Sequence, residues 1–255
     1  MIAFVGSVFS PYYALARRRH AQVNPENHCA INLAIYSPGN KRWTMTERSA
    51  ASISRNQTEF VIGPSSLHWN GDHLRVDFVE RAVPFGQRVV GHFKLYPKQL
   101  FNFSTHLDDQ HKHRWGPLAP AARIEVELES PKIKWQGNAY FDSNEGDEAI
   151  SKPFSEWDWS RAHLKDGSTA VIYDVRQKNG QERIIASKFN LDGTIESFAA
   201  PERVLLRKTS WGIQRNMRSE KNGGESSIDL LKTFEDTPFY AHSMLKSRLF
   251  GEDVI

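Results

Sequence analysis

The sequence has few cysteines, no long apolar run and little net charge, and each of these absences excludes a class of protein. A single cysteine, Cys29, among 255 residues excludes an internal disulfide and favours a reducing compartment. No apolar run reaches the roughly 18 residues that a membrane-spanning helix needs, and the apolar N-terminus lacks the basic region and cleavage site of a signal peptide. The 33 basic and 30 acidic side chains leave a net charge of +3, which is too small to indicate a nucleic-acid partner. We therefore expect a cytoplasmic protein that binds no nucleic acid.

Common catalytic motifs are also absent. The chain has no glycine-rich phosphate loop, no GxSxG nucleophile elbow, no HExxH and no paired CxxC. The run from His106 to His113 does carry metal-binding side chains, and His111 and His113 would point to one face of a strand. Because this run is polar and lies between predicted strands, a solvated loop is the stronger interpretation. We predict no metal site.

Short alternating segments separated by turns make up most of the chain. Residues 123–129 alternate apolar and charged side chains, which is typical of a half-buried strand. Asn70-Gly71 and Asn179-Gly180 each lie between extended runs and predict hairpins. Many short strands with regular turns indicate a barrel or a sandwich. We therefore expect an all-β fold.

Helix is predicted in two places. Tyr12–Arg19 follows Ser10 and Pro11, which suit the N-cap and the first helical position, and Tyr240–Leu249 is the second candidate. The basic run at residues 17–20 has two interpretations: a solvated surface turn, or a contact with anionic lipid head groups. The polar stretch Ser219–Ser227 predicts a loop.

The predicted strands divide into two groups. No predicted strand crosses Pro117 to Pro120, so this stretch is the expected seam between domains. We predict an N-terminal β lobe over residues 1–118 and a C-terminal β lobe over residues 119–255.

The stretch from Trp135 to Arg161 carries a dense cluster of aromatic and acidic side chains. Tyr140 and Asp142 lie two residues apart at the end of a strand-like run, so in a strand both face the same side. Acids flanked by aromatic rings are typical of carbohydrate contact or of chemistry that passes through a cation. The further acids at residues 145–148 could form a carboxylate pair for glycoside cleavage, although acids in such a polar loop are more often turn formers.

Two further aromatic sites accompany this cluster. Trp157 and Trp159 share one face if their segment is extended, and core packing is the more ordinary role of such a pair. His113 leads into Trp115, where a polar run gives way to a large aromatic ring and a turn.

Taken together, these segments resemble the bacterial carotenoid 1,2-hydratases (hydroxyneurosporene synthases). The matching segments are IAFVGSVFSPYYALARRR at 2–19, NHCAINLAIY at 27–36, RWTMTERSA at 42–50, IGPSSLHWNGD at 62–72, HRWGPLAPAARIEVEL at 113–128, GNAYFDSNEGDEA at 137–149, FSEWDWSRA at 154–162 and AVIYDV at 170–175. The resemblance covers nearly the whole chain. Members of the family carry further segments before residue 2 and after residue 249, so the chain resembles a member shortened at both ends.

The resemblance implies a cofactor-independent hydro-lyase that adds water to the terminal C1=C2 bond of an acyclic carotenoid such as neurosporene or lycopene. The product is a tertiary alcohol of the spheroidene or spirilloxanthin pathway. It also implies a lipocalin-like β-barrel or sandwich that holds a long apolar chain. Because such a substrate is insoluble in water, we expect peripheral contact with the membrane.

By match to the family's motifs, Asp142 is the expected acid, Tyr140 and Trp115 are cation stabilisers, and His113 is an accessory residue. Hydration of an isolated alkene requires protonation of C2, which leaves a tertiary cation at C1. Burial would raise the pKa of Asp142 and keep it protonated, and aromatic faces stabilise a desolvated cation by about 1–2 kcal/mol each. The proton that the attacking water releases then passes to Asp142 or to His113.

Two other functions use the same architecture. A non-catalytic carrier of lipids or isoprenoids needs the apolar cavity but no protonated acid, so an exposed and ionised Asp142 would favour it. A lipocalin-like polyene cyclase would give a product without added oxygen.

Overall fold

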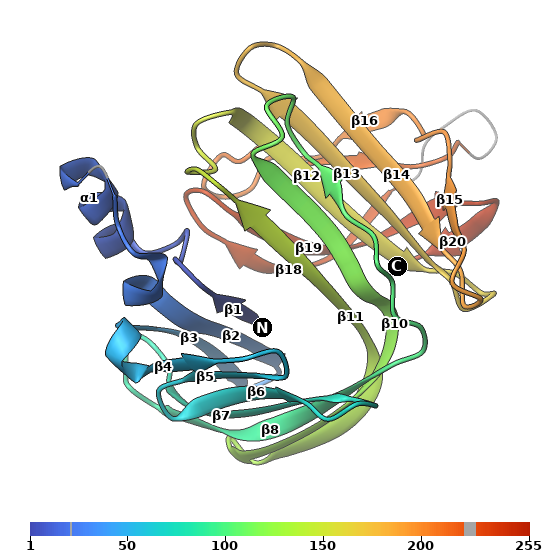
Figure 1. The fold of residues 1–255 in the computed structure, drawn as a ribbon. Helices are drawn as coiled ribbons and strands as arrows, with labels where there is room; N and C mark the ends of the chain where they lie inside the picture. The colour runs from blue at the N-terminus through green and yellow to red at the C-terminus, as the bar shows by residue number, and fades with distance from the viewer. Residues whose placement is uncertain (21, 222–227) are drawn as a thin grey trace. The chain divides into compact units, whose positions relative to one another are not determined.

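The computed structural model describes residues 1–20, 22–221 and 228–255 (Figure 1). Strands make up most of the described chain, and the predicted all-β fold is confirmed. Within the described residues, α-helix is confined to α1 (Pro11–Arg19), beside the short 3-10 turns η1 (Pro25–His28) and η2 (Ala50–Ser52). Most of the predicted loop Ser219–Ser227, from 222 to 227, lies outside the described residues.

The chain forms two compact units. Unit 1 comprises residues 1–97 and 122–139, and unit 2 comprises residues 98–121 and 140–255. The chain therefore passes between the units three times, twice within the long strands β10 (His113–Ser130) and β11 (Ile133–Gly146). The sequence predicted a single passage, between residues 118 and 119.

The expectation that no strand crosses Pro117 to Pro120 is wrong, because β10 runs straight through this stretch. Proline cannot donate a ladder hydrogen bond, so it fits a strand only where its neighbours need no donor from it. Here neighbouring carbonyl groups act as acceptors: Leu118 accepts from the Phe101 amide at 3.0 Å and Ala121 from the Lys98 amide at 2.9 Å. Neither bond needs an N–H group from a proline.

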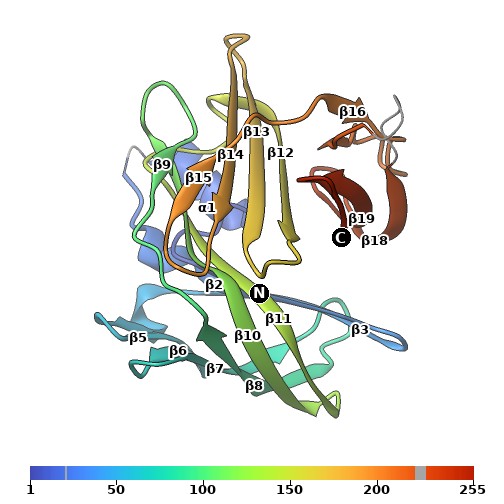
Figure 2. The ribbon, with the colours of Figure 1, turned by 90° about the vertical axis from the view of Figure 1, so that its right-hand side faces the viewer.

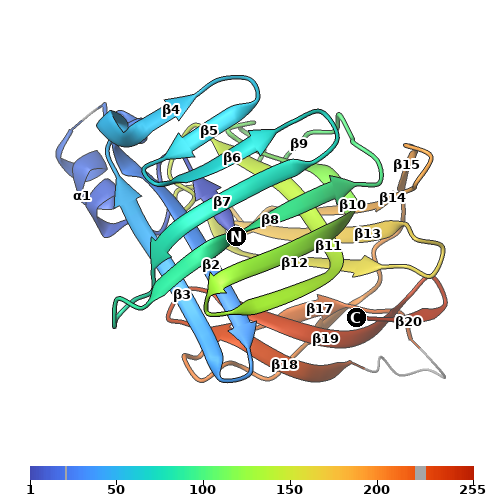
Figure 3. The ribbon, with the colours of Figure 1, turned by 90° about the horizontal axis from the view of Figure 1, so that it is seen from below.

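Unit 1 is a sandwich of two sheets with its core between them. The smaller sheet has the order β1 (Ile2–Phe4), β2 (Cys29–Ser37), β3 (Asn40–Arg48). The larger sheet runs from β11 and β10 through β8 (Arg88–Pro97), β7 (Leu74–Arg81), β6 (Ser65–Trp69) and β5 (Glu59–Ile62) to β4 (Ile53–Arg55). Figure 3 shows β2 and β3 crossing the strands of this sheet. Buried side chains of β2, such as Ile31, pack against Val76 and Phe78 of β7.

Unit 2 is built on a sheet of β12 (Phe154–His163), β13 (Thr169–Gln177), β14 (Glu182–Phe189) and β15 (Ile195–Ser197), which lie side by side in Figure 2. The short strand β9 (Thr105–His106) pairs with the start of β10. The remaining strands are the pair β16 (Arg203–Leu205) and β17 (Asn216–Arg218), and the sheet of β18 (Asp229–Asp236), β19 (Ala241–Leu249) and β20 (Glu252–Val254).

Two hairpins and one helix N-cap that short sequence motifs predict are present in the structure. The hairpins at Asn70-Gly71 and Asn179-Gly180 are confirmed, with both glycines at positive φ, 105° and 86°. The N-cap of α1 is confirmed too, since the Ser10 hydroxyl accepts a hydrogen bond from the Tyr13 amide at 2.9 Å.

The helix predicted over Tyr240–Leu249 is wrong, because residues 241–249 form strand β19. This segment pairs with β18 on one side and with β20 on the other. Its last residues alternate in burial, with Ser247 and Leu249 buried and Arg248 partly exposed. Strand preference depends on such neighbours more than on the residues themselves.

A buried carboxylate, Asp174 of β13, fastens the β16–β17 pair to the main sheet of unit 2. Its Oδ1 accepts from Arg203 Nη2 at 2.9 Å, and its Oδ2 accepts from Arg218 Nε at 2.8 Å. Burial by itself would raise the pKa of Asp174, but the hydrogen bonds and charges of these two arginines hold it below the usual value. Asp174 is therefore ionised and paired in the folded protein.

Candidate active site

Asp142 of β11 accepts hydrogen bonds from two aromatic residues in unit 2. Trp115 Nε1 on β10 donates to Asp142 Oδ2 at 2.9 Å, and the Tyr140 hydroxyl donates to the same oxygen at 3.1 Å. Tyr140 and Asp142 therefore face the same side, as their spacing predicts. Among the described residues, no side chain donates a hydrogen bond to Oδ1 of Asp142. The two aromatic donors therefore fix the carboxyl group through Oδ2.

The ring of Trp115 is fully buried by other aromatic rings. It meets Tyr173 of β13 at 5.5 Å and Phe103 at 6.1 Å between ring centroids, both edge to face, and Phe189 at 6.5 Å. Such packing fixes the orientation of the indole. Its N–H group is therefore held in place to orient Asp142.

Burial controls the acidity of this carboxyl group. Burial raises the pKa of Asp142 above its usual value, although the hydrogen bonds from Trp115 and Tyr140 and the charge of Arg161 lower it in part. Burial and the adjacent Asp142 also raise the pKa of Tyr140, so this hydroxyl keeps its proton. A carboxyl group with a raised pKa and a fixed orientation is suited to act as a general acid.

Arg161 of β12 is a site neighbour that the sequence did not single out. Its guanidinium carbon lies 5.2 Å from the centroid of the Tyr140 ring, and Trp159 meets the same ring edge to face at 5.2 Å. The guanidinium also lies 3.2 Å from His163 Nε2. Burial, together with the charges of Arg161 and Lys98, lowers the pKa of His163 to about 4, so this ring is neutral near pH 7.

The two-residue alternation of side chains along β12 could have identified Arg161 from the sequence. The spacing that puts Trp157 and Trp159 on one face extends two residues further to Arg161. Core packing is not the role of the two tryptophans, which are 40% and 36% exposed. Trp159 instead contacts Tyr140, whereas Trp157 contacts Phe154 at 6.3 Å.

His113 lies two residues before Trp115 on β10 and is also buried. Its ring meets Phe154 at 4.9 Å, and its Nδ1 lies 3.5 Å from Asp108 Oδ2. The structure therefore brings Asp142, Tyr140 and Trp115 into direct contact, while His113 adjoins them along the strand without a hydrogen bond to Asp142.

Of the other histidines in this run, His106 ends β9 and His111 lies in the turn that precedes β10. The rings of His106 and His111 stack at 4.2 Å. No group of three or more His, Cys, Asp or Glu side chains within the described ranges is arranged to hold a metal ion.

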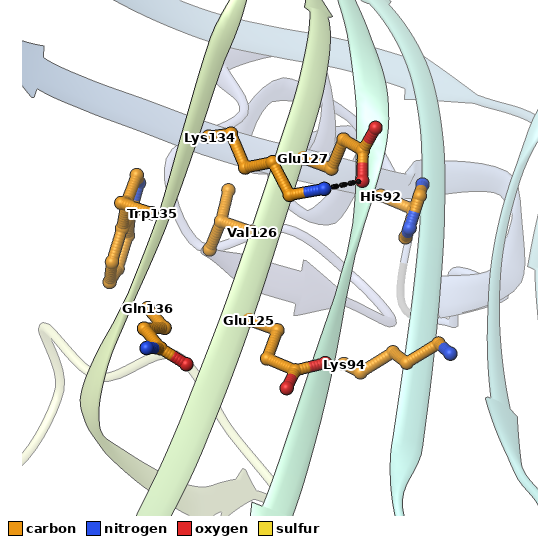
Figure 4. Close-up of a pocket in the computed structure, with 8 residues that line it drawn as sticks. All are labelled: His92, Lys94, Glu125, Val126, Glu127, Lys134, Trp135 and Gln136. Atoms are coloured by element: carbon orange, nitrogen blue, oxygen red, sulfur yellow. Dashed lines mark hydrogen bonds and ion pairs between the residues drawn. The ribbon is translucent and has the colours of Figure 1, made fainter.

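Unit 1 has a surface hollow of about 540 Å³ on the face of β8, β10 and β11 (Figure 4). It is lined mainly by charged side chains, including the ion pair of Lys134 with Glu127 at 3.0 Å, and by Trp135. None of the four predicted site residues lines it. Mixed charges of this kind suit a polar ligand better than a hydrocarbon chain.

A family model and several known proteins match this chain over nearly its full length. The family model described as carotenoid hydratase CrtC matches residues 1–255. An acyclic carotenoid 1,2-hydratase of Rubrivivax gelatinosus is 57% identical over 254 residues, which cover 99% of this chain and 62% of that protein. A protein of the same name from Thiocapsa roseopersicina is 43% identical (99% and 61%), and one from Rhodobacter capsulatus is 34% identical (100% and 88%). The chain thus spans about three-fifths of the first two relatives.

A solved structure described as AttH from Nitrosomonas europaea has a similar fold, with a TM-score of 0.56. The two chains are 16% identical, and the match covers 80% of this chain and 69% of that one. At this identity the likeness concerns the fold alone, and it confirms the predicted lipocalin-like architecture.

Proposed function

Because the chain belongs to the carotenoid hydratase CrtC family, we propose that it adds water to the terminal C1=C2 bond of acyclic carotenoids such as neurosporene or lycopene. The product is a 1-hydroxy carotenoid, a tertiary alcohol. The observation that carries this proposal is the Asp142 carboxyl group, whose Oδ2 accepts hydrogen bonds from Trp115 and Tyr140 and whose pKa is raised by burial.

In the first step, Asp142 Oδ1 donates its proton to C2 of the alkene. Trp115 and Tyr140 donate to Oδ2 both before and after this transfer, and hydrogen bonds to an ionised carboxylate are about twice as strong as neutral ones. They therefore stabilise the conjugate base as its charge forms. Donors that are already oriented toward a developing charge lower the barrier without reorganisation.

The tertiary cation at C1 is the intermediate that the aromatic side chains must stabilise. We assign this role to Tyr140 and Trp115, and such faces contribute about 1–2 kcal/mol each when desolvated. Trp159 adds a ring beside Tyr140 that is more than a third exposed and thus open to substrate. Water then attacks C1, and its proton passes to a base. None of these steps requires a cofactor.

The apolar substrate suggests collection from a membrane by peripheral contact at the cytoplasmic face. No helix among the described residues is long and apolar enough to cross a bilayer. The α1 region instead exposes Val8, Tyr12 and Leu15 beside Arg17–Arg19, and α1 contains no acidic residue. Exposed apolar side chains next to basic ones are typical of segments that lie on anionic membranes.

The alternative of a non-catalytic isoprenoid carrier predicts an exposed, ionised Asp142. The partial burial and raised pKa of this residue favour the hydratase instead.

The test is incubation of the purified protein with lycopene in liposomes in H₂¹⁸O, followed by mass spectrometry. We expect the product to gain one labelled water, and Asp142→Asn to abolish this gain while the fold is retained. Asp147→Asn, which neutralises an exposed carboxylate on the same stretch of chain, is the matched control and should behave as wild type. Conversion by Asp142→Asn at the wild-type rate would remove Asp142 from the mechanism, and a folded wild-type protein without any conversion would contradict the proposed function.

A further inference from the structure

Asp108 and His113 form a buried pair whose polar atoms are incompletely satisfied. Asp108 is 0% exposed and His113 is 4% exposed. Asp108 Oδ2 and both ring nitrogens of His113 lack a hydrogen-bond partner among the described residues. Buried polar atoms are nearly always paired, and exceptions are associated with bound water or with catalysis.

The backbone fixes Asp108 in this position. Its Oδ1 accepts from the Lys112 amide at 3.0 Å and from the His113 amide at 2.9 Å, which closes the turn before β10. The Asp108 carbonyl accepts from the His111 amide at 3.2 Å, and His111 takes a left-handed φ of 58° to complete the turn. With Oδ1 occupied, the remaining oxygen, Oδ2, lies 3.5 Å from His113 Nδ1.

A carboxylate beside Nδ1 determines which nitrogen of a neutral imidazole carries the proton. The proton stays on Nδ1, and Nε2 keeps its lone pair as an acceptor. A histidine oriented by a buried aspartate, with its other nitrogen open, is the arrangement of a general base in hydrolytic triads.

Gly146 of β11 packs closely beside this acceptor. A Cβ atom at residue 146 would lie 2.9 Å from His113 Cδ2 and 3.3 Å from Nε2. A larger residue would therefore crowd the side of the ring that carries Nε2. Glycine at this position keeps a side chain away from Nε2.

The pair lies beside the Asp142 site. His113 and Trp115 alternate on the same face of β10, about 7 Å apart along the strand. Phe154, which contacts His113, belongs to the same apolar cluster as Trp115, and Tyr140 packs against that cluster. Enzymes that protonate one side of a bond and activate water on the other separate the two groups to leave room for that water.

We propose that Asp108 is a positioning residue that holds His113 as the general base for the attacking water. This inference rests on the proposed hydration. After Asp142 protonates C2, the water oxygen bonds to C1 and one water proton passes to His113 Nε2. The imidazolium that forms is paired with the Asp108 carboxylate. Its proton then returns through solvent to Asp142, so the cycle consumes one water and leaves no net charge.

Asp108→Asn tests the role of the carboxylate with little change in shape. The amide oxygen can still accept from the Lys112 and His113 amides, whereas the amide nitrogen would donate to Nδ1 and shift the ring proton to Nε2. In the corresponding change of a catalytic triad, kcat falls about 10⁴-fold, and we expect a fall on the order of 10²–10⁴-fold here with KM little changed. Asp109→Asn is the control, since this exposed neighbour accepts a hydrogen bond from the Gln177 side chain, at 3.2 Å, and has no contact with His113 among those of the described residues.

A second measurement does not depend on turnover. In ¹⁵N-histidine NMR spectra, with the His113 signals assigned by their loss in His113→Gln, we expect an Nδ1–H tautomer in wild type and an Nε2–H tautomer in Asp108→Asn. Wild-type kcat in a folded Asp108→Asn variant, or an Nε2–H tautomer in the wild type, would overturn the proposal. If the wild type shows no hydration, the proposed function fails separately, and the tautomer still decides whether Asp108 sets the state of His113.

Discussion

Replacing Trp115 with phenylalanine separates its hydrogen bond from its aromatic packing. Phenylalanine keeps a ring among Phe103, Tyr173 and Phe189 but removes the N–H group that lies 2.9 Å from Asp142 Oδ2. A hydrogen bond to a charged group contributes about 1.5–3 kcal/mol. Because Asp142 becomes charged only along the reaction path, this loss falls on the transition state. At 1.36 kcal/mol per factor of ten, kcat should fall about 10- to 150-fold with KM little changed.

The same substitution should also move the pH profile. The proposed acid works in its protonated form, so kcat/KM falls as the pH rises through the pKa of Asp142. The hydrogen bond from Trp115 lowers this pKa, and its removal should therefore raise the pKa and shift the alkaline limb of the profile to higher pH. Tyr140 and Arg161, which also lower the pKa, remain in place.

The assay is steady-state lycopene hydration in liposomes across a range of pH, for wild type, Trp115→Phe and Trp157→Phe. Trp157 is the control because it lies on β12, contacts Phe154 and is 40% exposed. Losses in kcat that are matched by a rise in KM, or an alkaline limb that does not move, would show that Trp115 acts through packing and would refute the reasoning.

Two further predictions concern the membrane and the stability of unit 2. Replacement of Arg17, Arg18 and Arg19 by glutamine should weaken binding to anionic vesicles on the order of 10²-fold, at about 1 kcal/mol per basic residue, without affecting binding to neutral vesicles in a sedimentation assay. Asp174→Asn should lower the free energy of unfolding by about 3–5 kcal/mol in urea denaturation, because it leaves Arg218 without a carboxylate partner and Arg203 with Glu182 alone. Since pairing holds the pKa of Asp174 below its usual value, the stabilisation is present above the unfolded-state pKa and is lost as the pH falls through the folded-state value. A wild-type urea midpoint for Asp174→Asn would contradict this account.

Features encoded over a few residues could be predicted from the sequence. The two Asn-Gly hairpins and the Ser10 cap of α1 depend on backbone preferences of adjacent residues. The shared face of Tyr140 and Asp142 follows from the two-residue period of a strand. Where the local signal was weak, as in Tyr240–Leu249, pairing with β18 and β20 determined the outcome.

The sequence by itself determined the strand-rich fold, the family and three side chains of the candidate site. The tertiary structure alone decided how these side chains contact one another. Trp115 is 27 residues from Asp142, and Arg161 is 21 residues from Tyr140. The pairing of β10 with β11 puts the Trp115 N–H on Oδ2 of Asp142. Burial raises the pKa of Asp142 and, among the described residues, leaves Asp108 Oδ2 and the ring nitrogens of His113 without hydrogen-bond partners. The physical reason is that side chains alternate along a strand, so the sequence alone fixes the face of the sheet on which each one lies. Desolvation and hydrogen bonding depend instead on residues from distant segments that pack against that face.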